Sequence, residues 1–414
     1  MKLVRTLRTF CFVVAAVALV ACGGEPSGTG RDAAAPAPSA GGPPRQEPLE
    51  GGPYPALLVT QAQFTEKDGK PVPGPAKLLI VRSTPDGWKT VTIEDPDSNV
   101  FHKAIAYESG ILTIGATKAA LKAWLWANGT WNQRTIWDPM FGGKFDRLRD
   151  IEVGDVDHDG QDDLVISTHD QGVVGVVHPF ADRAWSIEEV DRQPDTFVHE
   201  VEIADLTGDG KKEFFTTPSK PNKVDQEQGG EVRVYRKTEE GWSKANVDTS
   251  LTTHAKEILA ADIDNDKSSE LYVAWEGTIG KDGKLEVPVT VKEYRLMSGA
   301  AGGMFVQRVV AEVPDRQMRV LAAGDVNGDG KTDIVGSSLK KGIWLFERDG
   351  TNWKVKNIDD NSSGYEHPLH LADLDGDGAL EIYVASEDQG ELNVLRWKDG
   401  KFEKSVVMPL NKGD

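Results

Sequence analysis

A nine-residue pattern of acidic residues recurs along the chain and constrains its fold more than any other feature. Its five copies read DVDHDGQDD (155–163), DLTGDGKKE (205–213), DIDNDKSSE (262–270), DVNGDGKTD (325–333) and DLDGDGALE (373–381). Each copy follows a few apolar residues and precedes a strand-like run such as LVIST or EIYVAS. Repetition at this spacing indicates a repeat protein in which each unit packs on its neighbours.

The loops carry oxygen-bearing side chains at positions 1, 3, 5 and 9. Calcium takes six to eight oxygen ligands in flexible geometry, and a backbone carbonyl at position 7 would add one more. We therefore predict up to five calcium ions. The predicted ligands are, in chain order, Asp155, Asp157, Asp159, Gln161 and Asp163; Asp205, Thr207, Asp209, Lys211 and Glu213; Asp262, Asp264, Asp266, Ser268 and Glu270; Asp325, Asn327, Asp329, Lys331 and Asp333; and Asp373, Asp375, Asp377, Ala379 and Glu381.

Two copies depart from the pattern. Position 6 is glycine in four loops, as a sharp backbone turn favours, but Lys267 occupies it in the third, which makes that site doubtful. Thr207 replaces a carboxylate in the second loop and should weaken binding there. The last acid falls at position 9 rather than 12, which argues against an EF-hand. Asp-Gly clusters can also be ordinary turns, but five copies with the same offsets favour a metal site.

These loops resemble the calcium loops of the FG-GAP/VCBS repeat family, which include those of integrin α-subunit propellers. The resemblance covers roughly residues 148–385 through the loops alone, since the Phe-Gly and Gly-Ala-Pro boxes of the family are not recognisable. It implies a β-propeller with calcium on one face, in the turn between the first and second strands of a blade. It implies no single function.

A second periodic signal sets the number of blades. An apolar strand, a polar turn and an aromatic residue that opens another strand recur seven times, with Trp88, Trp131, Trp185, Trp242, Phe305, Trp353 and Phe402 as the aromatic residues. Combined with the loops, this predicts an all-β, seven-bladed propeller of four-stranded antiparallel blades over residues 54–414, with six or eight blades as alternatives. The blade at 101–140 lacks a loop. The first blade lacks a clear innermost strand, so it is either three-stranded or completed by a segment of the tether.

The N-terminus has the pattern of an export signal. Lys2, Arg5 and Arg8 precede an apolar run that is too short to span a membrane. The run ends Leu-Val-Ala-Cys, which resembles a bacterial lipobox and implies cleavage before Cys22 and acylation of that residue. An ordinary secretory signal is the alternative. We therefore divide the start of the chain into a lipoprotein signal peptide (1–21) and a lipidated Cys with a disordered Gly/Pro/Ala-rich tether (22–53).

These features predict an exported protein that is lipid-anchored to the bacterial cell envelope. Gly23, and not an aspartate, follows the cysteine. By resemblance to lipoproteins of enteric bacteria, this residue favours sorting to the outer membrane in a Gram-negative source. The formal net charge is −19 and no basic stripe is present, which argues against nucleic acid as a partner. Contact with the membrane is expected only through the lipid.

The residue six places before each loop forms a set of its own. It is cationic or imidazole-bearing in every repeat, and a similar residue precedes the turn of the loop-less blade: His102, Arg149, His199, Lys256, Arg319 and His367. Six strand residues span about 20 Å, which places these side chains at the mouth of the central channel, away from calcium. They could bind an anionic or polyhydroxylated ligand. Alternatively, they pair with acids of neighbouring blades, such as Asp150, Glu200, Glu202 and Glu257, and plug the channel.

Three functions remain open. We expect a calcium-stabilised binding module for a glycan or an envelope protein rather than an enzyme. The alternative is a carbohydrate-active lyase or dehydratase, because some sugar-processing enzymes resemble this chain in combining calcium-loop propellers with central His and Arg residues. Such an enzyme should bring His102, His199, His367 and Arg319 together. A subunit of a larger envelope assembly is the third possibility.

Overall fold

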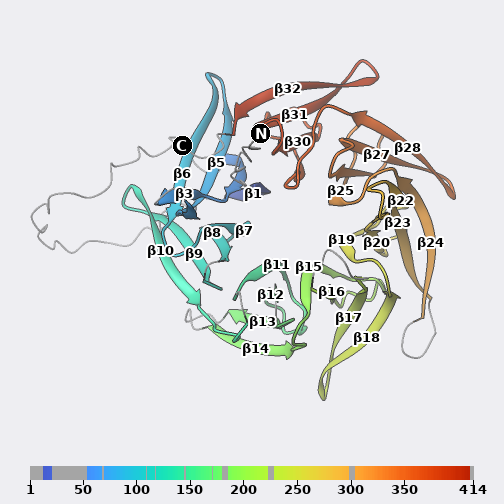
Figure 1. The fold of residues 1–414 in the computed structure, drawn as a ribbon, viewed down its shortest axis with the longest axis horizontal. Coiled ribbons are helices and arrows are strands. Elements are labelled where there is room, and N and C mark those ends of the chain that lie inside the picture. Colours follow the sequence, from blue (N-terminus) through green and yellow to red (C-terminus); the bar gives the residue numbers. More distant parts are fainter. Residues whose placement is uncertain are drawn as a thin grey trace, which may run out of the picture.

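The structure is a computed structural model that describes residues 13–20, 54–67, 70–108, 110–116, 118–143, 146–169, 171–179, 185–221, 228–297 and 304–410. Seven four-stranded antiparallel sheets follow one another around a ring (Figure 1). The predicted seven-bladed β-propeller is therefore confirmed. Within the described ranges, no helix is long and apolar enough to cross a membrane.

Each blade uses its strands in chain order from the channel outward. The innermost strands are β1 (Val13–Val20), β7 (Phe101–Tyr107), β11 (Leu148–Gly154), β15 (Phe197–Ala204), β19 (Ala255–Ala261), β25 (Met318–Gly324) and β29 (Leu369–Ala372). The second strands are β2 (Tyr54–Gln61), β8 (Gly110–Gly115), β12 (Asp163–Thr168), β16 (Glu213–Ser219), β20 (Glu270–Trp275), β26 (Asp333–Ser338) and β30 (Glu381–Ser386).

The outer half of each blade is a hairpin. The third strands are β5 (Ala76–Thr84), β9 (Leu121–Ala127), β13 (Val174–Pro179), β17 (Gly230–Thr238), β23 (Val289–Met297), β27 (Ile343–Asp349) and β31 (Glu391–Lys398). The fourth are β6 (Gly87–Asp95), β10 (Thr130–Trp137), β14 (Trp185–Asp191), β18 (Gly241–Ser250), β24 (Met304–Val313), β28 (Asn352–Asp359) and β32 (Lys401–Pro409). Two small hairpins, β3 (Phe64–Lys67) with β4 (Lys70–Pro73) and β21 (Thr278–Ile279) with β22 (Leu285–Val287), interrupt blades 1 and 5.

Burial explains why the second strands are the most apolar. In blades 2 to 7 every residue of the second strand is buried, because a neighbouring blade covers each face of the sheet. Strands covered on both faces contain nearly continuous apolar runs instead of alternating residues. The fourth strands are the most exposed strands of the blades.

The core of the described residues consists of seven large clusters, one at each junction between neighbouring blades, and a small eighth cluster of Ala62, Val100 and Ala116. Each of the seven aromatic residues that open a fourth strand packs against a different cluster. At the junction of blades 7 and 1, for example, Trp88 meets Tyr383 edge-on, with ring centroids 6.1 Å apart. The prediction that these residues pack between blades is confirmed, and the blue and red ends of the ring in Figure 1 close by packing alone.

Blade 1 differs from the expectation. Its innermost strand is β1, which pairs antiparallel with β2 so that Val17 lies opposite Leu57. The strand thus comes from residues 13–20, inside the predicted export signal, and not from the tether at 22–53. It also contacts β7 and β29, the innermost strands on either side. Cys22 and the rest of the tether lie outside the described residues.

Ion pairs join the outer edges of neighbouring blades. An aspartate near the end of one fourth strand approaches a lysine of the next blade in the pairs Asp95–Lys122 (2.8 Å), Asp191–Lys244 (3.0 Å), Asp248–Lys292 (3.0 Å) and Asp359–Lys404 (2.8 Å). The first is the most buried, with both side chains 2% exposed. A buried pair stabilises little in total, but removing one partner leaves an uncompensated charge.

We predict that Asp95→Ala lowers the free energy of unfolding by about 1–3 kcal/mol, because the Lys122 ammonium loses its buried partner and keeps only the partly exposed Asp97, 2.9 Å away. Lys118→Ala is the matched control, since Lys118 and Asp97 form an exposed pair 3.2 Å apart. It should change stability by less than about 0.5 kcal/mol. Urea titrations of the three proteins measure both effects, and equal stability of the two variants would contradict the role given to the buried pair.

Candidate functional site

The five acidic loops, numbered 1 to 5 in chain order, all connect the innermost strand of a blade to its second strand. They join β11 to β12, β15 to β16, β19 to β20, β25 to β26 and β29 to β30. They therefore lie at the same end of their blades, where the sequence predicts them. In blade 2, β7 turns directly into β8, and Tyr107 pairs with Gly110.

The loops share one backbone turn. In each, the residue at position 6 has a positive φ and donates its N–H to the first aspartate; in loop 1, Gly160 N lies 3.0 Å from Asp155 Oδ2. Lys267 takes the same conformation in loop 3, with φ 76°, and donates to Asp262 at 2.8 Å. The missing glycine therefore does not change the turn, although a side chain there is strained.

The donor atoms suit a hard divalent cation. At least three carboxylates or imidazoles approach within 4.8 Å of one another in loops 1, 3 and 5. Asp155 Oδ1, Asp264 Oδ1 and Asp333 Oδ2 are buried without a hydrogen-bond partner. Buried carboxylate oxygens are costly unless they are paired or bind a metal. The predicted ligand residues thus fit calcium, which prefers oxygen donors.

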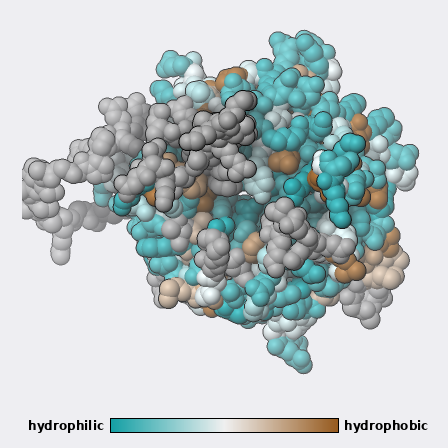
Figure 2. Space-filling model, in the orientation of Figure 1, coloured by the Kyte–Doolittle hydropathy of each residue, from teal (hydrophilic) through white to brown (hydrophobic). Residues whose placement is uncertain are grey.

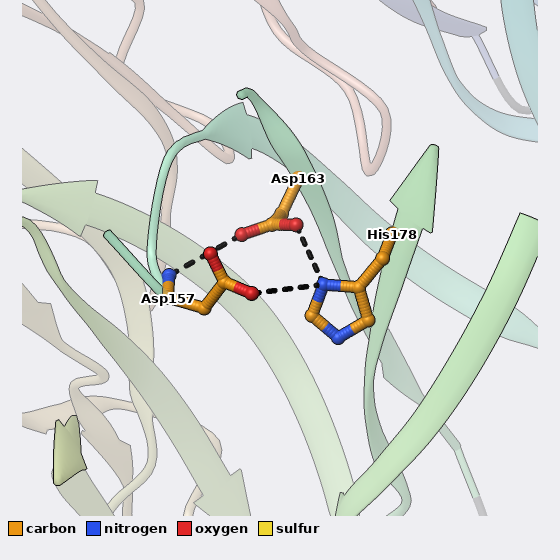
Figure 3. A group of neighbouring side chains, drawn as sticks. All are labelled: Asp157, Asp163 and His178. Carbon is orange, nitrogen blue, oxygen red and sulfur yellow. Dashed lines mark hydrogen bonds and ion pairs between the residues drawn. The ribbon is translucent and has the colours of Figure 1, made fainter. Parts of the chain in front are cut away.

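Sequence reasoning missed one member of loop 1. His178 on β13 points at the loop, with Nδ1 2.7 Å from Asp163 Oδ1 and 3.4 Å from Asp157 Oδ2 (Figure 3). Its other ring nitrogen lies 3.6 Å from Glu188. His178 is fifteen residues beyond Asp163, so only the pairing of β12 with β13 brings it to the loop.

The second predicted site is the central channel. It contains a cavity of about 520 Å³ lined by all innermost strands from blade 2 to blade 7. Of the six predicted residues, His102, Arg149, Arg319 and His367 line this cavity, whereas His199 and Lys256 are buried beside each other, with Nδ1 and Nζ 3.2 Å apart. The described residues on the face of the ring shown in Figure 2 are mostly hydrophilic.

The cations of the channel are paired with acids of the next blade. Lys103 approaches Asp150 at 2.8 Å and also contacts Glu152. Arg149 lies 3.8 Å from Glu200, and Arg319 lies 3.5 Å from Glu366 on the segment that leads into β29. Of the predicted cations, Arg149 and Arg319 thus each lie near an acid of the neighbouring blade, whereas Lys256 lies beside His199. The cavity shows that the pairs leave the channel open.

Carboxyl groups outnumber cations around the cavity. Lys103, Arg149 and Arg319 are its cationic lining, and the acids are Asp150, Glu152, Glu200, Glu202, Glu257 and Glu366. Lys103 and Glu152 lie one and three places after predicted residues of their strands, and Glu366 lies one place before His367. In a regular strand, residues at such odd spacings point to opposite faces, so the period of two did not predict them. The pairing is irregular at Phe101/Lys103 and Leu148/Asp150, and both kinds of residue line the cavity.

Two of these acids also satisfy the backbone of the next blade. Asp150 accepts a hydrogen bond from Val201 N at 2.8 Å, and Glu202 accepts one from Ala260 N at 2.9 Å. The channel edge of an innermost strand has no partner strand, and its free N–H groups need acceptors. Burial raises the pKa of Glu202 and Glu257 to about 8; Glu152 adds to the shift of Glu202, whereas Arg319 and Lys256 oppose that of Glu257. Both carboxyl groups are therefore largely protonated at neutral pH and can donate as well as accept.

The histidines of this region are buried and neutral. Burial, with a contribution from Arg149, lowers the pKa of His102 to about 3, and burial lowers that of His367 to about 4. Each Nδ1 lies 2.7 Å from a backbone carbonyl, that of Leu148 for His102 and that of Ser338 for His367. His199 stays outside the cavity lining, so the full convergence expected of a His–Arg enzyme site is not observed among the described residues.

We predict that His367 makes stability fall at acidic pH. Its folded-state pKa of about 4 is below the ordinary value of 6.5, so the unfolded chain binds more protons between these limits. The stabilising contribution is complete above about pH 6.5 and is lost as the pH falls toward 4. His367→Asn keeps a donor for the Ser338 carbonyl and removes the titration. Its melting temperature should fall less than that of the parent between pH 7 and pH 4.5.

The control for this measurement is His158→Asn. His158 is exposed and has a φ of 66°, which asparagine tolerates well. This variant should follow the parent at every pH. Parallel pH profiles for parent and His367→Asn would show that the buried imidazole does not contribute.

Comparisons with known proteins extend the repeat assignment. Residues 325–384, which contain loops 4 and 5, match the FG-GAP-like repeat family. A crystal structure of a protein from Lactobacillus plantarum aligns with a TM-score of 0.50 and 12% identity over 85% of this chain and 96% of that one. The Dos1 propeller aligns with a TM-score of 0.50 and 8% identity over 86% and 82%. No curated protein matches. Similarity at this level shows a shared fold.

Proposed function

We propose that this chain, a seven-bladed β-propeller with an FG-GAP-like repeat at residues 325–384, is a binding module that takes a small polyhydroxylated ligand into its central channel. The observation that carries the proposal is the cavity of about 520 Å³ at the centre of the ring. Ligand sites in proteins typically measure about 300–1,000 Å³ and combine apolar walls with a few oriented polar groups.

The two sides of the cavity differ in chemistry. Blades 3 to 5 contribute Asp150, Glu152, Glu200, Glu202 and Glu257, whereas blade 6 contributes mostly apolar groups, among them Val320, Leu321 and Ala322. Because the acids include protonated carboxyl groups, the polar wall offers both donors and acceptors. Hydroxyl groups of a sugar need both, and its C–H faces suit the apolar wall.

Charge argues against an anionic ligand. Each of Lys103, Arg149 and Arg319 already has a carboxylate partner on the neighbouring blade. An anion would have to break one of these pairs and leave a buried carboxylate uncompensated, which is costly. Of the two ligand classes considered from the sequence, the polyhydroxylated one is therefore favoured, and the end of a glycan chain is the natural example.

We predict that neutral oligosaccharides raise the melting temperature of the calcium-loaded protein by at least about 2 °C at millimolar concentration. Ala322→Phe should abolish the shift, because the ring would fill the cavity that Ala322 lines. Val306→Phe, at a 49% exposed position on the outer strand β24, is the matched control and should keep it. A shift that survives Ala322→Phe would place binding outside the channel, and a response to acidic sugars alone would contradict the charge argument.

The same screen tests the enzymatic alternative. His367 Nε2 is buried without a hydrogen-bond partner, and His367 lines the cavity together with Arg319 and Glu366. A base beside a guanidinium can abstract a proton next to a carboxylate, as a lyase requires. Release of unsaturated sugar products by the parent and not by His367→Asn would favour a lyase over a binding module.

We further propose that the module is calcium-stabilised, exported and held at the cell envelope by a lipid on Cys22. The support is the sequence Leu-Val-Ala-Cys at residues 19–22 and the Gly/Pro/Ala-rich composition of residues 23–53. A tether of this composition would let the propeller reach a glycan at some distance from the membrane.

Labelling with a radioactive fatty acid in a bacterial host tests the anchor. The parent should incorporate label and run shorter than its precursor, whereas Cys22→Ser should remain unlabelled and uncleaved at this site. Cys11→Ser is the control, because Cys11 lies within the predicted signal and should not affect lipid attachment. Equal labelling of the parent and Cys22→Ser would disprove the lipid assignment.

A further inference from the structure

We infer that one side chain on the third strand of each blade decides whether the adjacent loop holds a divalent cation. The inference rests on the calcium binding proposed above and concerns which loops use it. Position 9 of each loop is the first residue of the second strand. The antiparallel pairing of the second and third strands determines which residue of the third strand lies opposite position 9. The facing residues of loops 1 to 5 are His178, Arg236, Arg295, Glu347 and Arg396.

Loops 2 and 5 contain a guanidinium at this position. Arg236 Nε lies 3.2 Å from Glu213 Oε1 at position 9 of loop 2. In loop 5, Arg396 Nε lies 3.4 Å from Glu381 and 3.5 Å from Asp375, which stands at position 3. The positive charge that these carboxylates need is thus supplied by the protein.

Loop 3 carries two guanidinium groups. Arg295 Nη2 lies 2.6 Å from Asp264 Oδ2 and 3.0 Å from Glu270 Oε1. Arg348 of blade 6 approaches Asp264 Oδ2 as well, at 3.0 Å. Calcium binds its ligand oxygens at 2.3–2.6 Å, so a metal ion would compete with the arginines for the same oxygens. The four acids of loop 3 can lie close together because these two arginines supply positive charge.

Loop 4 has the opposite arrangement. Glu347 faces Asp333. Loop 4 and its facing residue therefore contain four acids, Asp325, Asp329, Asp333 and Glu347, and the neutral Asn327. Asp333 is 2% exposed, and its Oδ2 has no hydrogen-bond partner. Glu347 receives a hydrogen bond from Asn327 Nδ2 at 3.3 Å. Among the described residues, the carboxylates of loop 4 lie farther apart than those of loops 3 and 5. This is expected because like charges repel and no arginine lies between them.

The cations near loop 4 lie at its margin. Lys356 Nζ lies 2.5 Å from Glu347 Oε2, and Lys331 Nζ lies 3.9 Å from Asp329. Both lysine side chains are more than half exposed, at 55% and 69%, and neither pairs with Asp333.

Asp264 Oδ1 of loop 3 is also buried without a partner, but Asp264 Oδ2 contacts two arginines, whereas Asp333 has no ion pair with a cationic side chain among the described residues. The uncompensated carboxylate of Asp333 therefore points to a bound cation. Loop 4 is the tightest site, loop 1 with its imidazole is second, and loops 2, 3 and 5 are neutralised by arginine.

Reciprocal substitutions test the assignment. Glu347→Arg installs in loop 4 the group found in three other blades, and calorimetric titration with calcium should lose the tightest binding phase, with affinity at that site reduced by roughly ten-fold or more. Arg396→Glu recreates the loop 4 arrangement in loop 5 and should add a tight site. Glu403→Arg and Arg192→Glu make the same charge changes at exposed positions on β32 and after β14 and should leave the titration unchanged.

Asp333→Asn provides a second test of loop 4 that does not depend on accommodating an arginine. This nearly isosteric change removes the unpartnered carboxylate and should also abolish the tightest phase. A tight phase that persists in both loop 4 variants, or no added site in Arg396→Glu, would overturn the inference while calcium binding itself stands. A parent that takes up no calcium and melts at the same temperature in excess chelator would instead refute the proposed calcium binding.

Discussion

The structure depends on the burial of each blade between two others. A second strand such as β26 has no exposed residue, so a single blade in water would present two apolar faces. Both apolar faces of every blade are buried in the clusters at the junctions only when the ring is complete. Four of the junctions also have an ion pair at the periphery, such as the buried Asp95–Lys122 pair.

The same geometry accounts for the chemistry at the centre. Seven innermost strands turn an unpaired edge toward the channel, and acids reach across from the preceding blade to accept their free N–H groups, as Asp150 does for Val201. Cations offset part of this negative charge, and Arg149 and Arg319 do so from blades on different sides of the ring. The side chains that link neighbouring blades at the centre therefore also line the cavity.

Much of the fold could be predicted because its signals are local. The loop acids and the aromatic residues recur at fixed spacings, and the seven-bladed ring follows from them. The channel was predicted only partly, since pairing such as Arg319 with Glu366 links residues 47 positions apart. The residues that face the loops, such as His178 and Glu347, depend on the pairing of two strands whose connection varies in length from blade to blade. Strand β1 was missed because eight small apolar residues suit an export signal as well as a strand.

Residues 13–20 are both a strand of blade 1 and part of the predicted export signal. In the full chain, β1 forms part of the channel wall between β7 and β29. If a signal peptidase removes these residues, the precursor and the mature protein have different channels, one closed on the side of blade 1 and one with a strand-wide opening there. Blade 1 would then keep three of its strands, β2, β5 and β6.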